Sequence, residues 1–366
     1  MEAPLERLSH QLNLQLKGIF VPGLDDYLDS NGFRMYREFR LQLCGAGEAL
    51  DPVSMKLTVR PAAVTPYSFQ NEELLYEEQP LSFPNTHIYR VPIPLEEDAW
   101  HLKGYTFPFR GSRNPYRELR INPRISGSCP GRCIFCHRTH SHRLHPEQKH
   151  FPKPADLLEQ VRCSEGEDVF ARVAQVMLIS ELFGNEDRFL ASVQDTREAL
   201  LRAGFAADRE FNCCATDVRS LDGLKRLSEV VGLMRFSFSL EFFQNREEWM
   251  GAYKGIPMKQ VFTILENARR VGFEEIQLNY MAGMDGLEAC QQGFSALSRA
   301  GLVDSVGLST FVVFAEDEFA LRRPEAWREE YYQELVCVLN DCHIKAYRPD
   351  SYDMVCPHTY LMEKTQ

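Results

Sequence analysis

Short apolar strands and amphipathic helices alternate over residues 119–314, and no other feature constrains the fold as much. Strands that are buried on both faces are nearly continuous apolar runs, and their alternation with helices is typical of parallel β/α units. Strands are expected at 119–126, 174–180, 210–216, 233–242, 275–282 and 306–314. Helices are expected from Pro154 through Val161 and at 186–203, 221–231, 260–271 and 287–300, with Gly204 and Gly272 as C-terminal caps. The sequence therefore predicts an α/β fold.

The two ends of the chain differ from this pattern. The N-terminal part is expected to hold a helix at 3–16 and extended pieces such as 55–60 and 87–94 between Pro-rich turns, with the acidic stretch 72–78 as a solvated face. The C-terminal part is expected to hold a helix at 324–342 and a capping tail rich in polar aromatic residues. Three domains are predicted: 1–112 (mainly β), 113–315 and 316–366.

Three cysteines lie in the loop after the first predicted strand. Cys129, Cys133 and Cys136 have Cys-x3-Cys-x2-Cys spacing, and Gly131 lets the loop turn tightly. Three thiolates can hold three irons of a [4Fe–4S] cluster and leave the fourth iron open, whereas four cysteines are the norm for such clusters. A structural zinc site is one alternative, although zinc usually takes four ligands. Chance clustering of buried thiols is the other.

The spacing, with Phe135 directly before the last cysteine, resembles the signature loop of the radical S-adenosylmethionine (SAM) enzymes. The resemblance extends over about 119–314 and implies a partial (β/α)6, TIM-like barrel in the middle domain. It also implies two cofactors, a [4Fe–4S] cluster and SAM. In that superfamily the open iron chelates the amino and carboxylate groups of SAM. Reductive cleavage then yields methionine and a 5′-deoxyadenosyl radical.

Polar residues at the C-terminal ends of the predicted strands are the candidates for cofactor binding, because α/β barrels carry their ligand sites there. Glu181 follows the second strand, where the resemblance implies a contact with the amino group of SAM. The alternative is that Glu181 is only an acidic residue near the N-terminus of the next helix. Ser239 and Glu241 end the fourth strand and are assigned to the ribose or carboxylate of SAM, with an internal salt bridge as the alternative for Glu241. Gly283 follows the fifth strand, where adenine would approach the backbone.

Three further residues are catalytic candidates. Cys213 and Cys214 are adjacent in the third strand, so strand alternation places one of them inward, where it could donate a hydrogen atom to a product radical. A small buried apolar residue is the alternative role. Tyr352 in the C-terminal tail is a candidate for substrate contact, unless the tail rings only pack against the N-terminal domain. Five histidines in 137–150 are interpreted as a solvated loop that covers SAM.

Composition limits the classes of function. The 366 residues include eleven cysteines, an odd number without a signal peptide, which predicts reduced thiols in a cytoplasmic protein without a membrane span. The net charge of −11 disfavours a nucleic-acid partner, because nucleic-acid binding depends on Lys and Arg side chains at the phosphates. We expect a small-molecule substrate and a one-electron donor such as flavodoxin or ferredoxin. The alternatives are radical modification of a peptide or RNA, or a non-catalytic zinc- or metal-binding protein.

Overall fold

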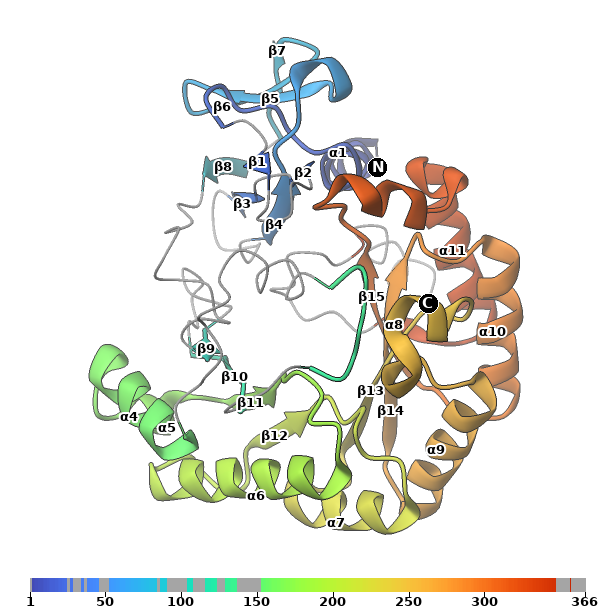
Figure 1. The fold of residues 1–366 in the computed structure, drawn as a ribbon. Helices are drawn as coiled ribbons and strands as arrows, with labels where there is room; N and C mark the ends of the chain where they lie inside the picture. The colour runs from blue at the N-terminus through green and yellow to red at the C-terminus, as the bar shows by residue number, and fades with distance from the viewer. Residues whose placement is uncertain are drawn as a thin grey trace.

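The N-terminal part combines one helix with short antiparallel sheets in this computed structural model, which is drawn in Figure 1. The structure describes residues 2–24, 27–28, 34–35, 38–45, 53–83, 86–90, 104–107, 116–123, 129–136, 153–346 and 356. Helix α1 spans Glu2–Lys17, as predicted. The strands are β1 (Tyr27–Leu28), β2 (Arg34–Met35), β3 (Glu38–Gly45), β4 (Val53–Thr58), β5 (Tyr67–Gln70), β6 (Glu73–Tyr76), β7 (Gln79–Pro80) and β8 (Thr86–Arg90), with a 3-10 turn at Ala62–Val64.

These strands form three antiparallel sheets, in the orders β1-β2, β4-β3-β8 and β5-β6-β7. The predicted solvated acidic face is confirmed, because Glu72, Glu73, Glu77 and Glu78 are all exposed on the β5-β6-β7 sheet. Alternate residues of the strands point into a small apolar core that includes Phe39, Leu57 and Phe69.

The rest of the chain is built around two four-stranded sheets, ordered β12-β11-β10-β9 and β13-β14-β15-β16. An isolated parallel bridge between Cys214 and Ser237 connects the two sheets. Strands β10 to β15 follow one another in parallel, as predicted, and β9 is antiparallel to β10. The strands are β9 (Tyr105–Thr106), β10 (Glu118–Ile121), β11 (Gln175–Leu178), β12 (Glu210–Cys213), β13 (Arg235–Glu241), β14 (Glu275–Ala282), β15 (Ser305–Thr310) and β16 (Lys345–Ala346).

Helices cover the outer side of these strands. Figure 1 shows the strands lining the inside of an arc and the helices outside it. The helices are α4 (Pro154–Glu165), α5 (Val169–Arg172), α6 (Glu186–Arg202), α7 (Leu221–Val231), α8 (Arg246–Lys254), α9 (Met258–Val271), α10 (Leu287–Arg299) and α11 (Glu329–Asp341). Within the described residues no ladder joins β9 to β16, so these strands form an open arc.

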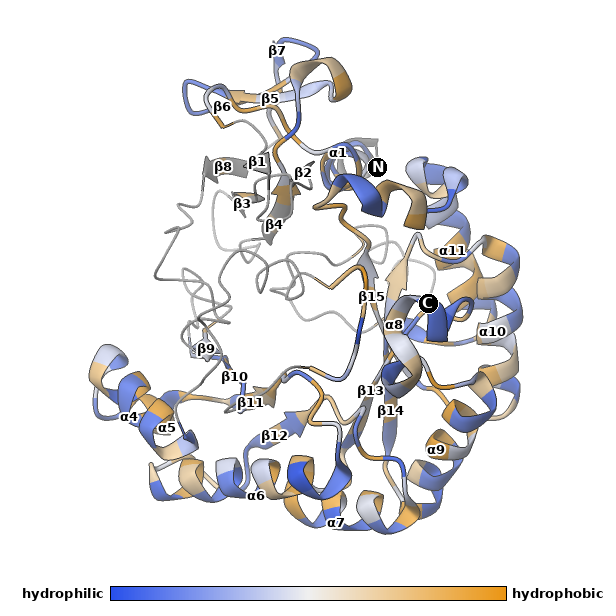
Figure 2. Cartoon of the chain, viewed as in Figure 1, coloured by the Kyte–Doolittle hydropathy of each residue, from blue (hydrophilic) through white to orange (hydrophobic). Residues whose placement is uncertain are grey.

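Amphipathic sequence explains why the helices pack this way. In α9 the buried side chains are Val261, Ile264, Leu265 and Ala268, spaced so that they form one stripe. Figure 2 shows the corresponding mixture of hydrophilic and hydrophobic residues around each outer helix. The stripe packs on apolar strand residues such as Phe238 and Leu278 in the main core. None of the described helices is long and apolar enough to cross a membrane.

The differences from the predicted elements include a divided helix and an additional helix, besides the short elements α5, β9 and β16. The helix expected at 324–342 is divided into a 3-10 turn, Pro324–Trp327, and α11, because Arg328 has extended backbone angles (φ −112°, ψ 147°). Packing explains the break: Trp327 stacks on Phe319 of the preceding 3-10 segment, Glu316–Leu321, with centroids 5.5 Å apart. The second difference is α8, which follows β13 and was not predicted. The domain boundaries at 112 and 315 stay predictions.

Candidate cluster and cofactor site

The cysteine loop, residues 129–136, is attached to helix α8. The backbone N–H of Arg132 donates to the carbonyl of Met250 (3.1 Å), and the N–H of Ile134 donates to the carbonyl of Trp249 (3.0 Å). Helix α8 is interrupted directly after these carbonyls, at Gly251, whose backbone angles are φ 69° and ψ 162°. A Cβ at Gly251 would lie 3.3 Å from the Cβ of Arg132. The break therefore brings α8 backbone groups against the loop without a side chain between them.

Glycines also shape the inner side of the loop. A Cβ at Gly131 would lie 3.4 Å from Sγ of Cys129, 3.6 Å from Sγ of Cys133 and 3.1 Å from Cδ1 of Leu182. The thiols of Cys129 and Cys133 therefore both lie within contact distance of the position where a side chain at residue 131 would begin. Gly184, with φ 71°, lies against Pro130 from the loop after β11, because a Cβ there would be 3.1 Å from the proline Cγ.

The three cysteines of the loop fit an iron–sulfur cluster in which each thiolate binds a different iron. All ten described cysteines are free, Cys133 is buried, and Cys129 and Cys136 are half-buried. Burial, with a smaller contribution from Cys136, raises the pKa of Cys133 to about 12, although the nearby Lys254 cation opposes the shift. Among the described residues no three or more His, Cys, Asp or Glu side chains are grouped tightly enough to hold a single metal ion. An iron–sulfur cluster does not need that grouping, because its thiolates surround an inorganic core.

Phe135 packs inside the site. Its ring makes edge contacts with Phe242, after β13 (centroids 5.4 Å apart), and with Phe311, after β15 (6.5 Å). The cysteine loop is thereby held at the C-terminal ends of the parallel strands, the edge at which β/α barrels carry their ligand sites. From its place directly before the last cysteine, Phe135 is expected to put an aromatic face beside the cluster as a cofactor-binding residue, and this role stays a prediction.

The loop that carries Glu181 is held by a neighbouring aspartate. Asp217 is buried and accepts hydrogen bonds from the backbone N–H of Phe183 (3.0 Å) and Gly184 (3.1 Å), and from the hydroxyl of Tyr253 (2.6 Å). Burial raises the pKa of Asp217, and these three donors partly oppose the shift. Sequence reasoning did not assign Asp217 this role; its position just past the end of a strand was the available signal.

Glu181 itself is half-buried beside Leu182, which contacts the Gly131 side of the cysteine loop. The N-cap of α6 is Asn185, whose side chain accepts from the N–H of Arg188 (3.0 Å). The role of Glu181 toward SAM stays a prediction.

Glu241 lies in an unusual backbone conformation. Its φ is +67°, and the register between β13 and β14 shifts between Ser239 and Glu241. The carboxylate forms an ion pair with Lys254, the last residue of α8, and both side chains are largely buried. Burial alone would lower the pKa of Lys254, but the Glu241 carboxylate raises it above its ordinary value. Glu241 thus has a partner in the chain, and its role toward SAM stays a prediction.

A buried arginine holds this turn in place. Arg246 donates from Nε to the carbonyl of Ile256 (2.9 Å) and from Nη1 to the carbonyls of Phe242 (2.6 Å) and Leu240. The carbonyls of Leu240 and Phe242 flank Glu241, so the guanidinium supplies donors that a regular strand would have provided. Burial lowers the pKa of Arg246 to about 10, and nearby Glu241 opposes the shift.

The two adjacent cysteines of strand three have different surroundings. Cys214 Sγ lies 3.0 Å from Oγ of Ser239 and accepts from Nδ2 of Asn279 (3.5 Å), so its thiol belongs to a polar cluster on the inner face. Cys213 is buried in the main apolar core, on the opposite face of the strand. Burial raises the pKa of the Cys214 thiol, and hydrogen bonds with Ser239 and Thr216 oppose the shift.

Gly283 is surrounded by the C-terminal part of the chain. Its φ is +106°, and a Cβ there would lie 3.2 Å from Oη of Tyr332 and 3.5 Å from Cβ of Ala326. This packing by itself accounts for the glycine, and the contact with adenine stays a prediction. Tyr352 and the histidine-rich stretch 137–150 lie outside the described residues.

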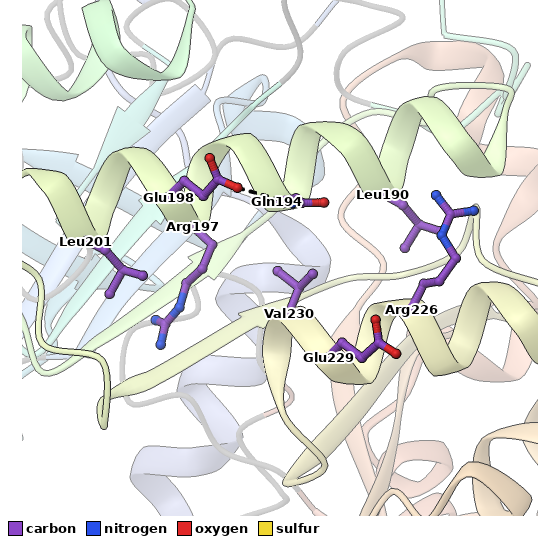
Figure 3. Close-up of a pocket in the computed structure, with 8 residues that line it drawn as sticks. All are labelled: Leu190, Gln194, Arg197, Glu198, Leu201, Arg226, Glu229 and Val230. Atoms are coloured by element: carbon purple, nitrogen blue, oxygen red, sulfur yellow. Dashed lines mark hydrogen bonds between the residues drawn. The ribbon is translucent and has the colours of Figure 1, made fainter.

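A groove on the outer helix layer is separate from these residues. Figure 3 shows it between α6 and α7, where Gln194 donates a hydrogen bond to Glu198 (3.1 Å). It is lined by Leu190, Gln194, Arg197, Glu198, Leu201, Arg226, Glu229 and Val230. None of the predicted site residues lines it.

Comparison with known proteins gives structural neighbours only. No protein-family model and no curated protein matches the chain. One matching structure is HydG, a maturase of the [FeFe]-hydrogenase. The match has a TM-score of 0.45 and 14% sequence identity, and it covers 63% of this chain and 50% of that chain. The structure of HydG from Carboxydothermus hydrogenoformans matches with a TM-score of 0.44 and 12% sequence identity, and the match covers 63% of this chain and 52% of that chain. A third matching structure is coproporphyrinogen III oxidase (HemN) from Escherichia coli, which is described as a radical SAM enzyme. This match has a TM-score of 0.39 and 17% sequence identity, and it covers 53% of this chain and 48% of that chain.

The chain thus spans about half the length of the solved structures that it matches. It is similar to radical SAM enzymes in its cysteine motif, and a radical SAM enzyme is among its structural neighbours. The subfamily is unresolved.

Proposed function

We propose that this protein is a radical SAM enzyme on a partial (β/α)6 barrel, which reductively cleaves SAM and abstracts a hydrogen atom from a small polar biosynthetic substrate. The observation that carries the proposal is the arrangement of Cys129 and Cys133, whose thiols both lie beside Gly131 in one short loop. Cys136 completes the donor set on the same loop. When bound, the [4Fe–4S] cluster would supply the electron that splits SAM into methionine and a 5′-deoxyadenosyl radical.

The residues around the loop bind, orient and exclude water. We assign Glu181 and Glu241 to polar groups of SAM, with the ion pair to Lys254 holding the Glu241 carboxylate in place. Phe135 and its aromatic neighbours close the inner side of the loop against solvent. Such positioning and water exclusion are the protein's contribution in enzymes whose cofactor carries the chemistry.

Cys214 is our candidate for donating a hydrogen atom to the product radical. Its raised pKa keeps the thiol protonated near neutral pH, so an S–H bond is present to be broken. Breaking it forms a C–H bond on the product and leaves a sulfur-centred radical on Cys214. One electron from an external donor such as flavodoxin or ferredoxin, together with one proton, restores the thiol.

The decisive experiment is metal analysis of anaerobically reconstituted protein. We expect about four irons and four sulfides per chain, from the cluster type that the motif implies. Replacing Cys129, Cys133 and Cys136 together by Ala should abolish the cluster and SAM cleavage. The matched control replaces two exposed cysteines, Cys163 and Cys337, and should keep both. Zinc in place of iron, or a full cluster in the triple variant, would contradict the proposal.

A further inference from the structure

One buried arginine has no hydrogen-bond partner. Arg322 is 3% exposed, yet within the described part of the chain none of Nε, Nη1 and Nη2 has an acceptor. The other buried arginines differ: Arg246 donates to three backbone carbonyls, and Arg60 donates to Oγ1 of Thr58 (3.1 Å). Arg322 follows the 3-10 segment Glu316–Leu321 directly.

Aromatic rings contact the Arg322 guanidinium. Its central carbon lies 4.4 Å from the ring centroid of Trp327 and 5.6 Å from that of Phe311. Trp327 is held by stacking on Phe319. A guanidinium stacked on rings uses its faces, and the N–H donors around its edge stay available for a planar acceptor.

The guanidinium lies at the functional end of the strands. Phe311 directly follows β15 and contacts Phe135 of the cysteine loop. The side chain of Arg322 also passes the end of β14, because a Cβ at Gly283 would be 3.8 Å from Cγ of Arg322. Figure 1 shows that β14 and β15 are neighbours in the arc. Arg322 is thus close to the elements that carry the proposed cluster site.

A buried charge without a counter-ion is costly, which indicates that something pairs with it in the working protein. The nearby acid, Glu318, forms no ion pair with Arg322 among the described contacts. Its Oε2 instead accepts from the backbone N–H groups of Phe314 (2.7 Å) and Ala315 (3.2 Å). Since this carboxylate already adds negative charge nearby, a doubly charged phosphate group is disfavoured at this position and a planar, singly charged carboxylate group is favoured.

We propose that Arg322 binds a carboxylate group of the substrate through two parallel N–H···O hydrogen bonds. That the carboxylate belongs to the substrate rests on the proposed function, in which the carboxylate of SAM is taken by the cluster. The proposal narrows the small polar substrate to a carboxylic acid. Bidentate pairing suits the planar fork of arginine and is poorly reproduced by lysine.

The first test is thermal stability without added ligand. Arg322→Met removes the charge and keeps an unbranched side chain against Trp327 and Phe311. If the charge is kept for a ligand, this variant should melt at the wild-type Tm or higher, because a buried unpaired charge has been removed. The control Arg246→Met should melt clearly lower, since it leaves three buried carbonyls without a donor. If the Tm of Arg322→Met falls as far as the Tm of the control, Arg322 has a structural role and the proposal is overturned.

The second test is ligand binding, followed by tryptophan fluorescence because Trp327 stacks on Arg322. Reconstituted wild type, Arg322→Gln, Arg322→Lys and Arg323→Gln are each titrated with sodium succinate, inorganic phosphate and SAM. Succinate affinity should fall about tenfold or more in both Arg322 variants, as expected for a lost charge-assisted pair. Arg323→Gln is the matched control: this half-buried neighbour already donates to Gln244 (2.9 Å), and its loss should leave succinate binding unchanged. SAM affinity should be equal in all four proteins.

Three results would overturn the assignment. Succinate binding that survives in Arg322→Gln would exclude the arginine as the ligand. Loss of SAM binding instead of succinate binding would assign Arg322 to the SAM carboxylate. A fluorescence response to phosphate but not to succinate would exclude a carboxylate as the ligand group. Iron and sulfide are measured on the same samples, so a protein that binds succinate through Arg322 but holds no cluster would contradict the proposed function separately.

Discussion

At the scale of single residues, buried carboxylates hold the loops that carry the candidate site. Asp217 binds two successive backbone N–H groups and the hydroxyl of Tyr253. Asp285 repeats this arrangement after β14, where it accepts from two successive N–H groups after β13 and from the hydroxyl of Tyr280. Each aspartate thus satisfies donors that a strand end leaves free, and each fixes the preceding loop. Their role is positioning.

The adjacent cysteines give a matched pair for one prediction. Cys214→Ala should keep the iron–sulfur spectrum and SAM cleavage but lower product formation strongly, because the inner-face hydrogen donor is gone. Cys213→Ala should cost about 1–2 kcal/mol of stability through lost apolar packing and leave product formation largely intact. Deoxyadenosine and product are quantified in parallel. Equal product yields from both variants would remove Cys214 from the mechanism.

The ion pair between Glu241 and Lys254 supports a second prediction. Glu241→Gln should weaken SAM binding by about ten- to a hundredfold, since one charge-assisted hydrogen bond is worth roughly 1.5–3 kcal/mol, while the cluster is retained. Glu275→Gln is the control, because Glu275 pairs with Arg235 (2.8 Å) at the opposite end of β14. Equilibrium dialysis with labelled SAM measures both. Wild-type affinity in Glu241→Gln would leave the carboxylate a purely structural role.

At the scale of elements, interruptions of regular structure position the site. Strand β13 ends in a register shift at Glu241, and α8 is interrupted at Gly251. Both irregularities lie beside the cysteine loop. Arg246, a few residues further along the chain, holds the first, and Arg132 of the loop contacts the second. Departures from ideal geometry often occur at functional sites, where surrounding contacts stabilise them.

Gly251→Ala tests whether the interruption of α8 supports the cysteine loop. The added Cβ would meet Arg132 and would carry a positive φ, at a cost of order 1–3 kcal/mol. Gly232→Ala is the matched control: Gly232 also follows helical residues at φ +81°, but a Cβ there meets nothing within 4 Å. Both variants should lose similar stability, and only Gly251→Ala should bind less iron per chain. Equal iron content would show that the loop does not depend on this contact.

At the scale of the whole molecule, the two ends of the chain meet the β/α units. Helix α1 places Leu12 and Leu16 in the main core and Leu14 in the N-terminal core, so it contacts both. Ser9 on α1 also donates a hydrogen bond to Glu329 at the start of α11. At the other end, β16 extends the sheet beside β15, and the N–H of Cys356 donates to the carbonyl of Leu308 (2.9 Å).

Truncation after Tyr347 tests the capping tail as a lid. The shortened chain should keep the iron–sulfur spectrum and some SAM cleavage, but deoxyadenosine should form without matching product, because the adenosyl radical is less shielded. Since Cys356 is fully buried, Cys356→Ala in the full chain serves as the control for lost packing and should keep normal coupling. Full coupling in the truncated enzyme would contradict the lid.

The sequence by itself determined the succession of strands and helices and the cysteine motif. These signals are local: apolar periodicity, proline and glycine at helix ends, and the spacing of three thiols in one loop. The six predicted strands are present as parallel neighbours. Strand β14 has the predicted bounds, and the other five are shorter than predicted, because strand ends depend on pairing partners.

Only the tertiary structure decided how the site is supported. The pairing of Glu241 with Lys254 and the isolation of Arg322 both depend on contacts that no local pattern encodes. The same reason explains the division of the helix expected at 324–342, where the stacking of Trp327 outweighs helical continuity. Burial and partner choice depend on how separate elements pack against one another, so they appear only once the chain is folded.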